Sequence, residues 1–131
     1  MHLFLDAGNG NILAFFELPN SPEMGRDPNT PLWVQHIAFQ LEDVEALMKA
    51  KAQLEANGIE VLGPTDHGII KSIYLFDPSG HRLELTVITA SDEQLKKLDD
   101  VKWEMLEDWT KTKSTVKQAD WLHKGEFTKA N

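Results

Sequence analysis

The chain has 131 residues, enough for one domain with a single hydrophobic core. Acidic residues outnumber basic ones 21 to 13 and the net charge is −8. This balance argues against a nucleic-acid or anionic-membrane partner, because binding to phosphates requires clustered Lys and Arg. Cysteine is absent, which excludes disulfides, thiolate nucleophiles and cysteine-ligated zinc, so any metal must be held by His and carboxylate groups.

The first predicted element is a β-hairpin. Residues 2–6 and 12–18 are apolar runs, and the segment 7–11 between them contains Gly and Asn residues that tolerate positive φ. A connector follows at 19–31, where four prolines and one glycine argue against regular structure. Neither a leader peptide nor a membrane-spanning run is recognised along the chain, and we expect a cytoplasmic protein.

The middle of the chain predicts a β-α-β-β-β unit. Its helix has Asp43 as N-cap and Gly58 just beyond its end, and its apolar residues repeat at helical spacing. The turn 77–80, with sequence Asp-Pro-Ser-Gly, separates the last two strands. In chain order, the predicted elements are a strand at 32–40, the helix at 44–56, and strands at 59–62, 72–76 and 82–88. The fold class is therefore α+β, with the opening hairpin as part of a second, similar module.

A C-terminal helix is predicted after this unit. Ser91 and Gln94 have the spacing of a capping box, and the helix is expected to continue to about Trp109. The remainder, 111–131, is polar, and we expect Trp121 and Phe127 to anchor it.

Three metal-capable side chains lie among apolar neighbours in the predicted strands. Alternation along the last strand places Leu83 and Leu85 toward the helix and Glu84 on the opposite face. His36 and Glu17 also stand in mid-strand positions. A carboxylate there is costly unless the face around it is polar. Nitrogen and carboxylate ligands suit Zn, Ni, Mn or Fe(II). The alternatives are a structural histidine at 36 and a carboxylate at the rim of a strand at 84.

Three stretches of the sequence resemble the second module of the vicinal-oxygen-chelate superfamily. They read VQHIAF at 34–39, GPTDHG at 63–68 and SIYLFDPSGHRLEL at 72–85. That superfamily includes glyoxalase I, extradiol dioxygenases, fosfomycin-resistance enzymes and bleomycin-binding proteins. The resemblance implies that His36 and Glu84 are metal ligands and that Glu17 matches the position of a third ligand. It also implies a domain at 1–90 without the first strand, helix and second strand of module one, followed by a helix and tail at 91–131.

The resemblance leaves three functions open, all directed at a small molecule with adjacent oxygens. His67 and Tyr74 resemble the acid and base pair of extradiol dioxygenases, which would use Fe2+ or Mn2+ to cleave a catechol. Glu17 favours a glyoxalase I-like lyase, which would use Zn2+ or Ni2+ and pass through an enediolate. The third possibility is a metal-free protein that sequesters its ligand, as bleomycin-resistance relatives do.

A module that lacks three elements would expose an unpaired sheet edge and apolar surface. Three accounts stay open: a shortened sequence, a partner chain that completes the sheet, and a minimal form of the fold. We expect a homodimer, with strand exchange as one route to it.

Overall fold

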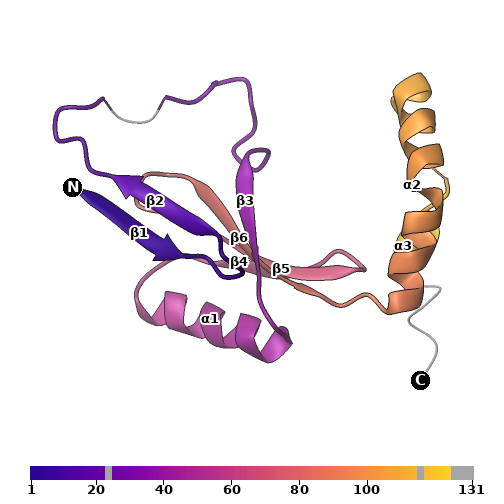
Figure 1. Cartoon of the computed structure of the whole chain (residues 1–131), viewed down its shortest axis with the longest axis horizontal. Coiled ribbons are helices and arrows are strands. Elements are labelled where there is room, and N and C mark those ends of the chain that lie inside the picture. The colour runs from indigo at the N-terminus through magenta and orange to yellow at the C-terminus, as the bar shows by residue number, and fades with distance from the viewer. Residues whose placement is uncertain (23–24, 115–116, 125–131) are drawn as a thin grey trace.

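The computed structural model of the protein describes residues 1–22, 25–114 and 117–124 (Figure 1). It contains a two-stranded hairpin, a four-stranded sheet with one helix against it, and a C-terminal pair of helices. The elements are β1 (His2–Asp6), β2 (Ile12–Phe16), β3 (His36–Gln40), α1 (Val44–Ala56), β4 (Leu62–Asp66), β5 (Ile70–Phe76), β6 (Arg82–Ile88), α2 (Asp92–Thr112) and α3 (Trp121–Lys124).

The four-stranded sheet has the order β3-β6-β5-β4. Strand β3 pairs with β6 in parallel, whereas β5 is antiparallel to both of its neighbours. The chain order from β3 to β6, with α1 after the first strand, confirms the predicted βαβββ unit and the α+β fold class. The first and last strands of this unit therefore lie side by side.

Helix α1 begins and ends where the sequence predicts. The Asp43 carboxylate accepts a hydrogen bond from the Ala46 amide at 2.8 Å, which satisfies a donor of the first turn. Gly58 follows the helix with a φ of 76°, a conformation that favours glycine. The helix lies across one face of the sheet (Figure 1), and Leu47 of the helix packs there with Ile73 and Val87 in a fully buried cluster.

The register of the sheet separates an apolar face from a polar one. Leu85 packs against the buried cluster on the α1 side. Its neighbour Glu84 is paired with Tyr74 across β5 and with Ala38 across β3, so these residues share the face away from α1. The predicted alternation around Glu84 is confirmed.

Three predicted strands of the sheet have different bounds in the structure, and the one predicted for 72–76 begins two residues earlier, at Ile70. The strand predicted for 32–40 begins only at His36, because the Val34 amide donates to the Pro31 carbonyl at 3.0 Å and closes a turn. The strand predicted for 59–62 instead covers Leu62–Asp66 and includes Pro64. Strand β4 lies at the edge of the sheet, where a residue without an amide hydrogen is tolerated.

The hairpin of β1 and β2 pairs as predicted, with His2 opposite Phe16. Its turn contains three successive residues with positive φ, at Gly8, Asn9 and Gly10. Strand β2 ends at Phe16 and not at residue 18. Neither strand of the hairpin comes within 8 Å, Cα to Cα, of a strand of the larger sheet.

Helix α2 starts with the predicted capping box, in which Ser91 and Gln94 each accept a hydrogen bond from the other's backbone amide. Trp121 of α3 is 6% exposed, so its predicted role as an anchor is confirmed. The other predicted anchor, Phe127, lies outside the described residues. Among the described helices, none is long and apolar enough to cross a membrane.

Truncation of the buried Leu47 side chain tests this core. Leu47→Ala should lower the free energy of unfolding by about 2–5 kcal/mol, because it removes buried methyl groups and leaves a cavity. The measurement is urea denaturation followed by circular dichroism. The neighbouring Met48, which is 41% exposed, provides the control. Met48→Ala should cost less than about 1 kcal/mol, and an equal loss in both variants would contradict this packing.

Candidate functional site

The centre of the candidate site is a histidine–glutamate pair on two adjacent strands. His36 on β3 and Glu84 on β6 bring their Nε2 and Oε2 atoms to 2.9 Å. The Glu84 side chain is 6% exposed and the His36 side chain 30% exposed. The parallel register of β3 and β6 places the two residues two positions apart on one face of the sheet. The structure therefore brings together the two residues that the sequence predicts as metal ligands.

The donor atoms of this pair suit a divalent metal. An imidazole nitrogen and a carboxylate oxygen are ligands that Zn2+, Mn2+ and Fe2+ accept in proteins. Within the described residues, however, no group of three His, Cys, Asp or Glu side chains has the arrangement of a metal site. The pair thus fits two positions of a metal shell, and a complete shell would need further ligands.

Glu17 is not part of this group. Its predicted position in the middle of a strand is wrong, because β2 ends one residue earlier and Glu17 is exposed. Its amide donates to the Met1 carbonyl at 2.9 Å, which continues the ladder of the hairpin for one more bond. The role of its carboxylate as a third ligand stays a prediction.

The predicted acid and base residues lie beside the pair. Tyr74 on β5 is directly opposite Glu84 in the antiparallel register. Its hydroxyl lies 2.8 Å from Nε2 of His67, which belongs to the turn between β4 and β5. The rings of His36 and Tyr74 stand edge to face with their centroids 6.0 Å apart. Four of the five predicted site residues therefore gather on one face of the sheet.

The surroundings of Tyr74 keep its phenol protonated at neutral pH. Burial raises the pKa of the Tyr74 hydroxyl above its ordinary value, and the nearby Glu84 carboxylate raises it further. The Arg82 guanidinium acts in the opposite direction on this pKa, with a smaller effect. A neutral phenol can both donate and accept a hydrogen bond, so Tyr74 can hold the imidazole of His67 in either tautomer.

Arg82, which is not among the residues predicted from the sequence, also belongs to this site. Its guanidinium lies over the Tyr74 ring, 4.5 Å from the centroid. Its Nε atom is buried and has no hydrogen-bond partner within the described part of the chain. The signal for it was present, because Arg82 precedes Glu84 by two residues in β6 and so must share its face.

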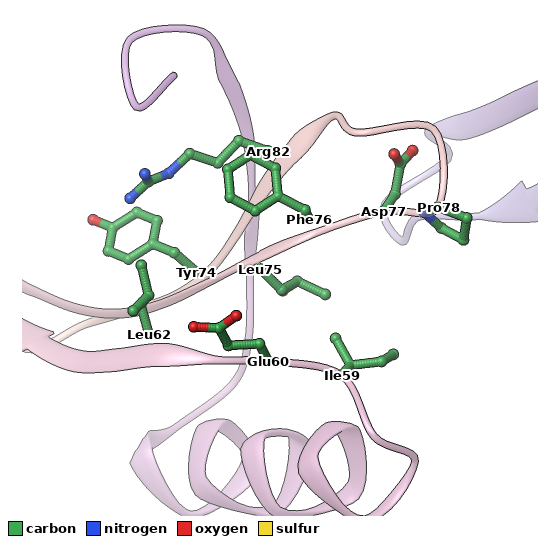
Figure 2. A pocket seen from close by; sticks show the side chains of 9 residues that line it. All are labelled: Ile59, Glu60, Leu62, Tyr74, Leu75, Phe76, Asp77, Pro78 and Arg82. Atoms are coloured by element: carbon green, nitrogen blue, oxygen red, sulfur yellow. The ribbon is translucent and has the colours of Figure 1, made fainter. Parts of the chain in front are cut away.

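A cavity of about 380 Å³ adjoins these residues at the end of β5 (Figure 2). Tyr74 and Arg82 form part of its wall, so the cavity and the predicted catalytic residues are contiguous. The complete lining is Ile59, Glu60, Leu62, Tyr74, Leu75, Phe76, Asp77, Pro78 and Arg82.

The chain is 33% identical over 75 residues to biphenyl-2,3-diol 1,2-dioxygenase 3 of Rhodococcus globerulus, which covers 57% of this chain and 39% of the relative. The chain thus spans well under half the length of that curated relative.

Solved structures with a similar chain fold were also found. A putative glyoxalase family protein from Bacillus anthracis is 21% identical with a TM-score of 0.49, covering 68% of this chain and 63% of the other. The fosfomycin resistance protein FosX from Listeria monocytogenes, in its hexagonal crystal form, is 24% identical with a TM-score of 0.48, covering 70% and 68%.

Membership of a family follows from the match to a family model. Residues 1–85, which include His36, His67, Tyr74 and Glu84, match the model described as Glyoxalase/Bleomycin resistance protein/Dioxygenase superfamily. This match covers well over half of the chain and agrees with the resemblance seen in the sequence. The chain belongs to the glyoxalase/bleomycin resistance protein/dioxygenase superfamily.

Proposed function

We propose that the protein is a metal-dependent enzyme of this superfamily that cleaves catechols in the manner of an extradiol dioxygenase. The observation that carries the proposal is the placement of the His67–Tyr74 hydrogen bond beside the His36–Glu84 pair, on one face of one sheet. The similarity to a biphenyl-2,3-diol dioxygenase supports the same reaction class.

His36 and Glu84 would hold the metal, Fe2+ or Mn2+ in this reaction. When bound, the ion would supply positive charge that attracts two adjacent substrate oxygens and makes their hydroxyl groups more acidic. Glu84 is well suited to this role, since a buried carboxylate needs a compensating positive charge or hydrogen bond and the structure gives it the His36 imidazole.

His67 and Tyr74 would handle the proton. His67 is exposed and can take a proton from a substrate hydroxyl at its free ring nitrogen. The 2.8 Å contact with the Tyr74 hydroxyl orients the imidazole, and Tyr74 is itself held between the His67 ring and the Arg82 guanidinium. In this arrangement the tyrosine fixes the position of the base relative to the metal ligands.

Within a single chain, the geometry favours this reaction over the glyoxalase I-like lyase. The lyase alternative, with Zn2+ or Ni2+, was based on Glu17, and that carboxylate lies apart from the His36–Glu84 pair in the described structure. The metal-free binding alternative differs in a simple observable, which is whether the purified protein takes up a transition metal.

We propose further that the protein forms a homodimer in which the hairpin packs against a second copy. Both faces of the hairpin are apolar and exposed: Phe4 and Phe16 on one face are 62% and 58% exposed, and Leu3 and Leu5 on the other are 51% and 45% exposed. A two-stranded hairpin is at best marginally stable alone. Apolar surface exposed on both of its faces indicates a contact with another protein surface. Exchange of hairpins between copies is one way to provide it, and it would carry Glu17 to the partner.

Loss of either proposed ligand tests the metal site. His36→Ala and Glu84→Ala should each weaken Fe2+ or Mn2+ binding by about 10-fold or more, which corresponds to about 1.4 kcal/mol. Glu84→Gln keeps the shape and should weaken binding similarly. The measurement is titration calorimetry under anaerobic conditions. His81→Ala, which changes an exposed histidine in the turn before β6, is the control. Wild-type affinity in a variant would remove that residue from the site, and a wild-type protein without stoichiometric metal would favour the metal-free binder.

The reaction class is tested with catechols and with a thiol–ketoaldehyde adduct. The Fe2+-loaded protein should convert a catechol to a yellow ring-cleaved product. His67→Ala and Tyr74→Phe should lower kcat by about 10²–10⁴-fold, because both disturb proton transfer, and should retain metal binding. Isomerisation of the adduct without catechol cleavage would replace the dioxygenase proposal by the lyase.

The dimer is tested by the mass of the protein in solution. Analytical ultracentrifugation should give about twice the monomer mass, and Phe4→Glu should shift the protein toward monomer because it places a charge in an apolar contact. Trp103→Glu, a change at a residue of α2 that is 73% exposed, is the control. If the partner supplies Glu17, Phe4→Glu and Glu17→Ala should both weaken metal binding. A wild-type monomer at all concentrations would refute the assembly.

A further inference from the structure

We propose that the cavity beside Tyr74 binds an uncharged apolar substituent of the substrate, an alkyl or aryl group, and that Leu62 and Glu60 set its selectivity. This inference rests on the proposed function for the identity of the substrate's reactive end. Apart from Tyr74 and Arg82, the residues that line the cavity have no role in the proposed reaction.

The cavity has the size and the lining for a small apolar group. Its volume of about 380 Å³ lies at the lower end of the range for ligand sites in proteins. The side chains labelled in Figure 2 come from the segment before β4, from the strands β4, β5 and β6, and from the turn after β5. Most of them are hydrocarbon: Ile59, Leu62, Leu75, Phe76 and Pro78.

The position of the cavity fixes which end of a ligand enters it. In the register of the sheet, Tyr74 lies between Glu84 on β6 and Leu62 on β4, whereas Phe76 lies opposite Arg82. A substrate whose oxygens face Glu84 would therefore pass Tyr74 and extend its substituent toward Phe76 and Leu62.

The unpartnered Nε atom of Arg82 adds an independent indication of a ligand. A buried donor without an acceptor costs free energy, and an acceptor oxygen on a bound molecule would recover that cost. The guanidinium is already held over the Tyr74 ring, at the end of the cavity next to the metal pair. A ring that carries an oxygen and an apolar substituent would place the oxygen near Arg82 and the substituent among the apolar residues of the cavity.

The charge of the lining selects against an anionic substituent. Two carboxylates, Glu60 and Asp77, line the cavity together with the single guanidinium of Arg82. The Asp77 carboxylate stabilises the turn, because its Oδ1 accepts a hydrogen bond from the His81 amide at 2.7 Å. Glu60 is exposed and lines the cavity together with Leu62 and Tyr74. A carboxylate on the substituent would face this negative charge.

The test uses phenols that lack adjacent oxygens, so that binding is measured apart from chelation and turnover. By calorimetry with the full chain, 4-tert-butylphenol should bind about 10-fold or more tighter than phenol, because its methyl groups leave water. 4-Hydroxybenzoate should bind no better than phenol. Leu62→Trp should remove the preference for the tert-butyl group by filling the cavity, and Leu62→Ala should reduce it by removing contacts.

Matched variants complete the experiment. Leu106→Trp changes another leucine of similar exposure, 53% against 51% for Leu62, and should leave the preference intact. Glu60→Gln should raise the affinity for 4-hydroxybenzoate several-fold, whereas Glu45→Gln on α1 should not. Equal affinities for phenol and 4-tert-butylphenol, or an unchanged preference in both Leu62 variants, would overturn the proposal. Failure of catechol cleavage alone would leave these binding results in place and would count only against the proposed reaction.

Discussion

The site depends on the parallel pairing of β3 with β6. These strands are the first and last of the βαβββ unit, and His36 and Glu84 are 48 residues apart in the chain. Their contact exists only because α1 carries the chain over one face of the sheet and lets β4 and β5 fill the other side of β6. The buried cluster around Leu47 stabilises that crossover, so the packing on the apolar face determines the geometry on the polar face.

Much of this arrangement could be predicted from the sequence, because it follows from side-chain alternation and capping rules. The bounds of α1 follow from Asp43 and Gly58, and the orientation of Glu84 follows from its leucine neighbours. The same alternation places the Arg82 side chain on the same face as Glu84. Arg82 was nevertheless not predicted as a site residue. Local patterns thus carry information about faces and ends of elements.

The sequence was less informative where tertiary context decides. The segment before His36 is rich in strand-forming residues but closes a turn at Pro31, and Pro64 is accommodated because β4 is an edge strand. Neither outcome is encoded in composition. Glu17 presents a related difficulty: its strand ends one residue too early, and the hairpin that carries it makes no strand-to-strand approach to the rest of the fold. Whether Glu17 can reach the metal site depends on where the hairpin packs. Side-chain alternation within one strand does not predict that position.

Tyr74 connects the proposed chemistry to the proposed selectivity. One side of its environment contains His67 and Glu84, and another forms the wall of the cavity with Arg82. The half-buried phenol stays protonated because partial burial disfavours the phenolate and because the phenolate would place a second negative charge near Glu84, which the Arg82 guanidinium only partly offsets. A substituent that enters the cavity excludes water from the same residues, and this strengthens the electrostatic interactions of Tyr74 with both Glu84 and Arg82. The fit of the substituent would therefore affect the proton-transfer residues directly, through a shared side chain and without any movement of the backbone.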